Sequence, residues 1–198
     1  MTDTAQFITE IAEADPVAFC KERMFTLDSW LFDEANLDEL TGDYGDFRAA
    51  ISYTVGVSEE DVRLVGSARF GLSMNPSKGV RPFNDESDLD VVIVSSDLFN
   101  KVWSEFRKAY YNGYTWVKTR HRDDVFRKFL NLARTSNYET EYLKKTARRL
   151  DKMAKNVVLR TGLARDLKYR IYEDWDAAVD YHAHGVRELQ RIIQDAPE

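Results

Sequence analysis

Cysteine is almost absent from this sequence of 198 residues, which contains only Cys20. A single thiol cannot form a disulfide within the chain, and it cannot build a zinc site that needs several cysteine ligands. Cys20 follows three apolar residues in a stretch of helical character, and we interpret it as a core residue. Histidine is also scarce: His182 and His184 lie in a predicted helix, where they point about 200° apart and make a poor metal pair.

Long apolar runs are missing as well. No segment approaches the ~20 apolar residues that span a bilayer. Residues 1–6 lack the basic and apolar regions of a signal peptide. We therefore expect a cytoplasmic protein with no membrane partner. The length is that of one compact domain, so we expect a single domain over residues 1–198.

Basic residues are few in the first half of the chain and concentrated in its middle. Residues 1–100 carry 7 basic and 20 acidic side chains, residues 101–165 carry 17 and 6, and residues 166–198 carry 4 and 8. The acidic first half argues against a protein whose whole surface coats nucleic acid. The basic middle block either attracts an anionic partner or is a solvated helix face.

The periodicity of the apolar residues predicts a chain that mixes helices with a few strands. Predicted helices cover residues 5–14, 44–54, 97–111, 123–134, 138–156 and 175–194, and predicted strands cover 62–65, 89–94 and 167–173. Asp15 and Pro16 suit the start of a further short helix. Ser96 is expected to cap the helix over residues 97–111, and Gly113 to end it. The chain thus divides into N-terminal helices (1–60), a sheet core (61–120) and a mainly helical part with one strand (121–198).

Two of the predicted strands adjoin residues that suit phosphate and metal chemistry. Gly66 and Ser67 directly follow the strand over residues 62–65, where backbone amides and the Ser67 hydroxyl can bind phosphate oxygens. Asp88 and Asp90 lie two residues apart at the start of the next strand and project to the same face. Two such carboxylates repel each other, and oxygen ligands suit magnesium, so the pair predicts a cation site.

The order of these elements resembles the signature of the DNA polymerase β superfamily of nucleotidyltransferases. The resemblance implies an α+β fold in which helices cover a small mixed sheet and a helical C-terminal part forms the other wall of a cleft. It also implies that Gly66 and Ser67 bind a nucleoside triphosphate such as ATP, and that Asp88 and Asp90 are catalytic ligands of Mg²⁺ or Mn²⁺. The expected reaction transfers a nucleoside monophosphate to an acceptor hydroxyl and releases pyrophosphate.

Two features depart from that family's pattern. The loop over residues 68–87 is longer than in the smallest members and contains Lys78 and Arg81, which are either ligands of the triphosphate or acceptor, or ordinary surface charges. Active members usually carry a third carboxylate on a later strand, and no clean match exists here. The predicted strand over residues 167–173 has Lys168 and Arg170 on one face and Glu173 on the other. The remaining candidates for the third carboxylate are Asp166, Asp123 and Asp124.

These departures leave three hypotheses. The first is an active nucleotidyltransferase. The basic block favours an anionic acceptor for it, which would be RNA, DNA or a nucleotide. The second is a non-catalytic relative that binds a nucleotide or a partner protein as a sensor or regulator, resembling components of toxin–antitoxin and antiviral systems. The third is a nucleic-acid-binding domain without nucleotide chemistry, whose binding would survive Asp88→Asn and weaken steeply with salt.

Overall fold

The computed structural model describes residues 4–33, 40–75, 80–132 and 138–195. At the N-terminus, helix α1 (Thr4–Glu13) confirms the first predicted helix. Helix α2 (Pro16–Phe19) begins, as predicted, behind Asp15, whose side chain accepts a hydrogen bond of 2.8 Å from the backbone N–H of Ala18. The chain then forms the π-helical turn η1 (Cys20–Met24) and the 3-10 turn η2 (Trp30–Phe32).

Four strands form one mixed sheet in the order β1-β2-β4-β3. Their bounds are β1 (Val62–Val65), β2 (Leu89–Val94), β3 (Phe129–Leu130) and β4 (Leu167–Tyr172). Strand β2 pairs antiparallel with β1 and parallel with β4, and β3 pairs antiparallel with β4. The α+β class and the small mixed sheet are therefore confirmed. The division of the chain was partly wrong, because residues 121–198 contribute two strands rather than one.

The remaining helices connect and flank these strands. They are α3 (Tyr44–Val55), the 3-10 turn η4 (Glu59–Asp61), α4 (Ser67–Phe70), α5 (Ser96–Tyr111), α6 (Trp116–Phe126), α7 (Glu141–Leu150), α8 (Met153–Thr161) and α9 (Trp175–Asp195). Helix α3 ends as predicted at Gly56, which adopts a left-handed φ of 79°. The cap of α5 was predicted one residue too late: Ser95 accepts the hydrogen bond from Leu98, and Ser96 is already helical. Asn112 ends α5, and Gly113 follows it with a φ of 94°.

Two predicted helices were wrong in their extent. The helix over residues 123–134 starts earlier, at Trp116, and ends at Phe126, because Lys128 takes a left-handed φ of 54° and the chain then pairs with β4. Residues 133 and 134 lie outside the described residues. The helix over residues 138–156 is divided into α7 and α8. The N–H of Lys152 bonds to the carbonyl of Arg149, which tightens the turn and ends α7.

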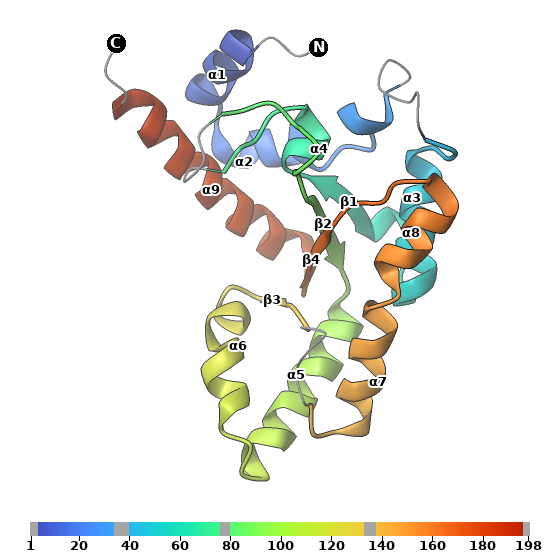
Figure 1. Cartoon of the computed structure of the whole chain (residues 1–198). Coiled ribbons are helices and arrows are strands. Elements are labelled where there is room, and N and C mark those ends of the chain that lie inside the picture. Colours follow the sequence, from blue (N-terminus) through green and yellow to red (C-terminus); the bar gives the residue numbers. More distant parts are fainter. Residues whose placement is uncertain (1–3, 34–39, 76–79, 133–137, 196–198) are drawn as a thin grey trace.

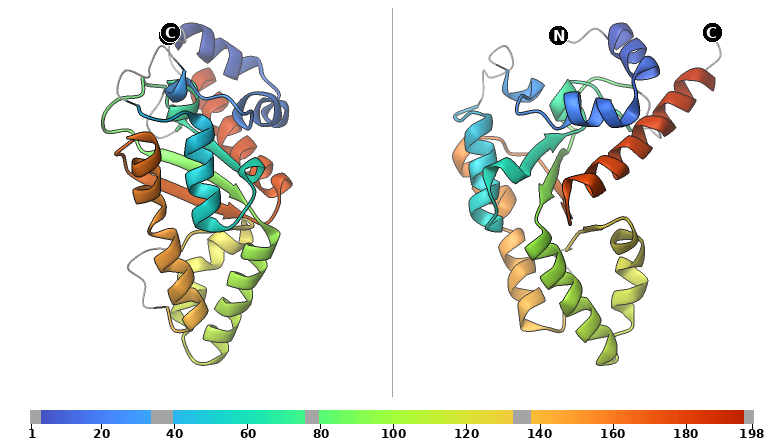
Figure 2. Two further views of the ribbon diagram at one scale, coloured as in Figure 1. Left: turned by 90° about the vertical axis from the view of Figure 1, so that its right-hand side faces the viewer. Right: turned by 180° about the vertical axis from the view of Figure 1, so that it is seen from behind.

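Helices cover both faces of the sheet (Figure 1). Helices α3 and α8 pack on one face, while α1, α2 and α9 lie on the other, and α5, α6 and α7 extend beyond the sheet (Figure 2). Strand β2 is buried from both sides because its residues alternate between two core clusters: Leu89, Val91 and Ile93 belong to the first, and Val92 and Val94 belong to the second. Asp88 and Asp90 have the parity of Val92, so they face the side of α9.

Candidate functional site

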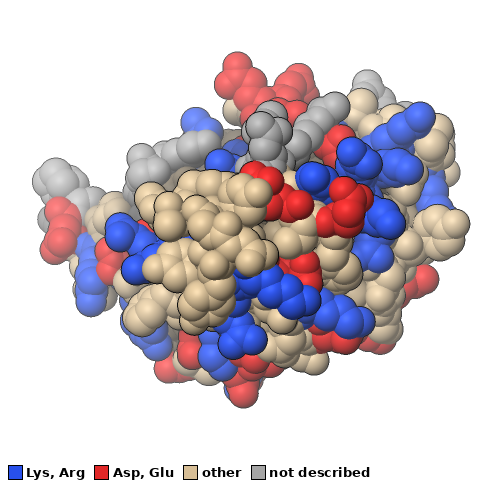
Figure 3. Space-filling model, turned by 90° about the horizontal axis from the view of Figure 1, so that it is seen from below, with Lys and Arg blue, Asp and Glu red and all other residues tan. Residues whose placement is uncertain are grey.

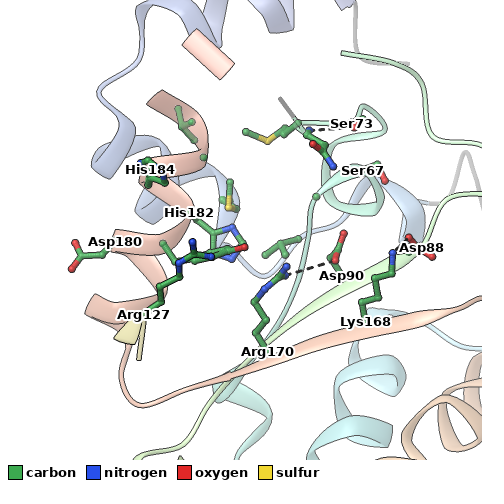
Figure 4. Close-up of a pocket in the computed structure, with 18 of the residues that line it drawn as sticks. Ser67, Ser73, Asp88, Asp90, Arg127, Lys168, Arg170, Asp180, His182 and His184 are labelled. Carbon is green, nitrogen blue, oxygen red and sulfur yellow. Dashed lines mark hydrogen bonds and ion pairs between the residues drawn. The ribbon is translucent and has the colours of Figure 1, made fainter. Parts of the chain in front are cut away.

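A cavity of about 830 Å³ lies between the sheet and α9. All four residues singled out in the sequence line it: Gly66 and Ser67 from the turn after β1, and Asp88 and Asp90 from the start of β2. The opposite wall comes from α9, with Asp180, His182 and His184 (Figure 4). The structure therefore brings together two segments that are about twenty residues apart in the sequence.

Gly66 has a backbone conformation that side chains rarely adopt, with φ 67° and ψ −144°. A Cβ atom built on Gly66 would lie 3.3 Å from Oδ2 of Asp90. The glycine thus allows the turn to pass directly beside one of the two carboxylates. Ser67 begins α4 at this point and lines the same cavity as Asp90.

Helix α4 is only four residues long and is anchored by Arg69. The Arg69 side chain is 9% exposed, and its guanidinium donates to the carbonyl of Arg23 at 2.8 Å, to Thr26 Oγ1 at 2.6 Å and to Asp28 Oδ1 at 2.9 Å. These bonds tie the turn that carries Gly66 to the segment following η1. They fix the phosphate-binding candidate to the N-terminal helices.

The loop after α4 closes another side of the cavity. Its two arms meet at a bridge between Leu72 and Pro82, and Ser73 N–H donates to the carbonyl of Arg81 at 2.7 Å. Ser73 and Arg81 line the cavity, so one of the two basic residues noted in this loop reaches the site. The other, Lys78, lies outside the described residues.

Asp88 and Asp90 face the cavity with partly exposed side chains, 25% and 36% of each being accessible. Leu89 between them is fully buried, and its N–H donates to the carbonyl of Asp166 at 2.8 Å. The core contact of Leu89 therefore holds the two carboxylates on one face of β2, as the alternation predicted.

Two cations on β4 face this acidic pair, a feature that the sequence reasoning missed. Lys168 Nζ donates a hydrogen bond to Oδ2 of Asp88, and this bond raises the pKa of Lys168. Nη1 of Arg170 lies 3.9 Å from Oδ1 of Asp90. Both side chains point from β4 toward the carboxylates (Figure 4). The shared face of Lys168 and Arg170 was evident from the sequence, but their position beside β2 was not.

None of the four candidates for a third carboxylate joins the pair. Glu173 pairs with Lys128 at 3.1 Å. Asp123 pairs with Arg122, and Asp124 lies 3.6 Å from His121. Asp166 precedes β4. Among the described residues, no group of three acidic, histidine or cysteine side chains is arranged to hold a metal ion.

The donor set nevertheless fits one magnesium ion that arrives with a nucleotide. Mg²⁺ in proteins is commonly held by one or two carboxylates together with phosphate oxygens and water. Asp88 and Asp90 supply two carboxylates on one face, and the Gly66–Ser67 turn lines the same cavity of about 830 Å³.

The basic block of residues 101–165 is spread over α5, α6, α7, α8 and their connections. Among the described residues of this block, Arg127 and Lys128 are the cations that line the cavity. Basic side chains instead gather on the side of α7 and α8, with acidic ones scattered among them (Figure 3). The exposed cations of these two helices and of the turn between them are Lys145, Arg148, Arg149, Lys152, Lys155 and Arg160. None of these residues lines the cavity.

Burial shifts the pKa of two side chains, Cys20 and His182. Cys20 is fully buried, as predicted, and burial raises the pKa of its thiol to about 12. Burial, and then the charge of Arg170, lower the pKa of His182 to about 3. The His182 ring lies among Phe25, Tyr172 and Tyr181, with Nε2 3.4 Å from the Tyr172 hydroxyl. His182 is therefore neutral at neutral pH.

No family model, curated protein or solved structure matches this chain. No helix of the described residues is long and apolar enough to cross a membrane. The functional assignment accordingly rests on the residues of the cavity.

Proposed function

We propose that this protein is a magnesium-dependent nucleotidyltransferase, which transfers a nucleoside monophosphate from an NTP to an acceptor hydroxyl. One observation carries the proposal. The Asp88 and Asp90 carboxylates line the same cavity as the Gly66–Ser67 turn, and Asp90 lies directly against Gly66. A phosphate on this turn would stand next to both carboxylates, which is the juxtaposition that metal-assisted phosphoryl chemistry requires.

Each residue has a defined role in this proposal. The amides of the Gly66–Ser67 turn and the Ser67 hydroxyl hold terminal phosphate oxygens. Asp88 and Asp90 hold Mg²⁺, or Mn²⁺ in its place, and a bound ion would neutralise charge on the α-phosphate and on the leaving group. Arg81 adds positive charge at the wall of the cavity.

The reaction is a substitution at the α-phosphorus. A lone pair of the acceptor hydroxyl oxygen forms a bond to phosphorus, and the bond from phosphorus to the bridging oxygen breaks. Pyrophosphate leaves with that electron pair, and the hydroxyl proton passes to water. The chain contributes by orienting the phosphates on Gly66 and Ser67 and by keeping the two carboxylates on one rigid strand.

The test is incubation of the protein with each α-labelled NTP and Mg²⁺ or Mn²⁺, with and without bulk RNA. Labelled product and pyrophosphate should form with the native protein and disappear in Asp88→Asn/Asp90→Asn. Asp97→Asn is the matched control, because Asp97 is an exposed acid on α5 that pairs with Lys101 at 2.8 Å. Transfer that persists in the double variant would refute the assignment of the two aspartates.

A second candidate function is favoured by Lys168 and Arg170. A site that pairs its two acids with cations and has no third carboxylate among the described residues suits a nucleotide sensor that binds without turnover. Such a sensor would regulate a partner protein. Metal-dependent binding of an NTP, measured by calorimetry, together with no labelled product from any donor, would favour this function over the enzyme.

The anionic acceptor remains part of the proposal for the enzyme. Arg127 and Lys128 are the cations of the basic block that border the cavity, at the turn between α6 and β3. An acceptor nucleotide or the end of an RNA or DNA strand would approach there. Replacing Arg127 by Gln should raise the KM for such an acceptor and leave the KM for the NTP unchanged.

A further inference from the structure

The acidic pair and the basic pair of the cavity form one neutral group of four charges. Strands β2 and β4 run parallel, with Asp90 opposite Lys168 and Val92 opposite Arg170. Residues that alternate along each strand share a face, so all four charged side chains emerge on the side of α9. Lys168 bonds to Asp88, and Arg170 lies near Asp90.

The two cations differ in how far the surrounding side chains restrict their movement. The Arg170 guanidinium lies 5.0 Å from the centre of the Tyr181 ring and 5.6 Å from that of Phe129, so aromatic faces fix it from two sides. The Lys168 side chain is 60% exposed. A flexible ammonium on a four-carbon stem can therefore move from Asp88 to another anion in the cavity without disturbing the sheet.

We propose that Lys168 binds the phosphates of the incoming nucleotide, while Arg170 stays in place, and that the transfer of Lys168 from Asp88 to a phosphate prepares Asp88 and Asp90 for the metal ion. The nature of the ligand rests on the proposed function. The exchange itself follows from the geometry of the two strands.

The physical basis is competition for the same carboxylates. While Lys168 and Arg170 face the acids, a divalent cation must displace them or share the site with like charges, which weakens its binding. Phosphate oxygens are strong acceptors for ammonium and guanidinium groups. Once Lys168 engages a phosphate, Asp88 loses the cation that neutralises it, and its repulsion with Asp90 favours a bound metal. Nucleotide and metal should therefore bind with positive cooperativity, each raising the affinity for the other by the same factor.

The exchange predicts opposite effects for a single substitution. Lys168→Met removes the charge and keeps the length of the side chain. The variant should bind Mn²⁺ alone more tightly than the native protein, by about tenfold, a factor within the usual range of coupling between sites. It should bind phosphate more weakly. A residue with a merely structural role would not change the two affinities in opposite directions.

Two separate titrations measure these affinities with defined probes. Binding of Mn²⁺ alone is followed by the electron paramagnetic resonance signal of the free ion. Binding of inorganic tripolyphosphate in the presence of EDTA is followed by calorimetry, which avoids any dependence on the base. Lys168→Arg should keep native values in both titrations. Lys101→Met is the matched control, because Lys101 pairs with Asp97 on α5 outside this cavity.

A reciprocal variant tests the exchange from the acidic side. Asp88→Asn releases Lys168 from its partner, so this variant should bind tripolyphosphate in EDTA more tightly than the native protein. Circular dichroism and urea unfolding of each variant establish that it is folded. The exchange is supported if Lys168→Met shifts its two affinities in the stated directions and Asp88→Asn binds tripolyphosphate more tightly.

Other outcomes overturn the inference. If Lys168→Met lowers both affinities or changes neither, or if the native protein binds no tripolyphosphate, Lys168 does not exchange between acid and phosphate. Failure of the proposed function looks different. In that case the two titrations behave as stated, but no labelled NTP is turned over, and the exchange serves a nucleotide sensor.

Discussion

Replacement of Gly66 by Ala tests the conformation on which the candidate site depends. At φ 67° and ψ −144°, a residue with a Cβ atom is strained, and conformations of this kind cost about 1–3 kcal/mol. The new methyl group would also meet Asp90 Oδ2 at 3.3 Å, which forces that carboxylate to shift. For a chain of this size, about 2 kcal/mol corresponds to a decrease in Tm of about 4–8 °C.

The matched control is Gly185→Ala on the opposite wall of the same cavity. Gly185 lies inside α9, and a Cβ atom there meets nothing within 4 Å. Alanine in a helix is favoured over glycine by about 0.8–1 kcal/mol, so Tm should rise by about 2–4 °C. Thermal unfolding followed by circular dichroism measures both variants. If Gly66→Ala is as stable as the native protein, the turn does not require glycine, and the argument for close approach to Asp90 fails.

Three further predictions concern the surroundings of the site. Arg69→Met should lower the free energy of unfolding, measured in urea, by about 2–3 kcal/mol, because it removes charged hydrogen bonds that anchor α4. Asp28→Asn should lower this free energy by less, since the Asp28 carboxylate is 73% exposed. The pKa of His182 lies below its unfolded value, so the unfolded chain binds a proton that the folded chain does not, and stability is lost as the pH falls from about 6.5 toward 3. His182→Phe should reduce the loss of stability between pH 7 and pH 4.5 in urea titrations, and an equal loss in both proteins would contradict this. Arg148→Ser/Lys152→Ser on α7 and the turn after it should leave NTP affinity unchanged in calorimetry, since neither residue lines the cavity and these exposed charges are screened by salt.

Elements with strong local signals could be predicted from the sequence. Strands β1 and β2 have the predicted bounds, and α9 differs from its prediction by one residue at its C-terminal end. In each case apolar periodicity and a flanking cap or glycine agree with the tertiary environment. The Gly66–Ser67 turn and the Asp88 and Asp90 pair could be singled out for the same reason, because each lies at a strand end that the local pattern already defines.

Elements that depend on distant partners could not be predicted. Strand β3 is two residues long, and its only signal is its pairing with β4, about forty residues later. Its residues, Phe129 and Leu130, also fit a helical pattern, so local periodicity favoured the wrong structure. The break between α7 and α8 has no proline or glycine to mark it. It is a tight turn at Asp151 and Lys152 that local sequence rules do not specify.

The charged group in the cavity shows how a tertiary contact changes the meaning of a sequence motif. The alternation along β4 assigns Lys168 and Arg170 to one face, but it does not say which strand lies beside them. Ile171 is fully buried in the first core cluster, and Lys168 and Arg170 have the opposite parity, so they lie on the other face of β4, where they line the cavity. A shift by one residue would bury the two cations and expose Ile171. The core residues of β4 therefore direct its cations toward Asp88 and Asp90. If the acidic pair binds a metal ion as we propose, that ion must compete with Lys168 and Arg170 for the two carboxylates.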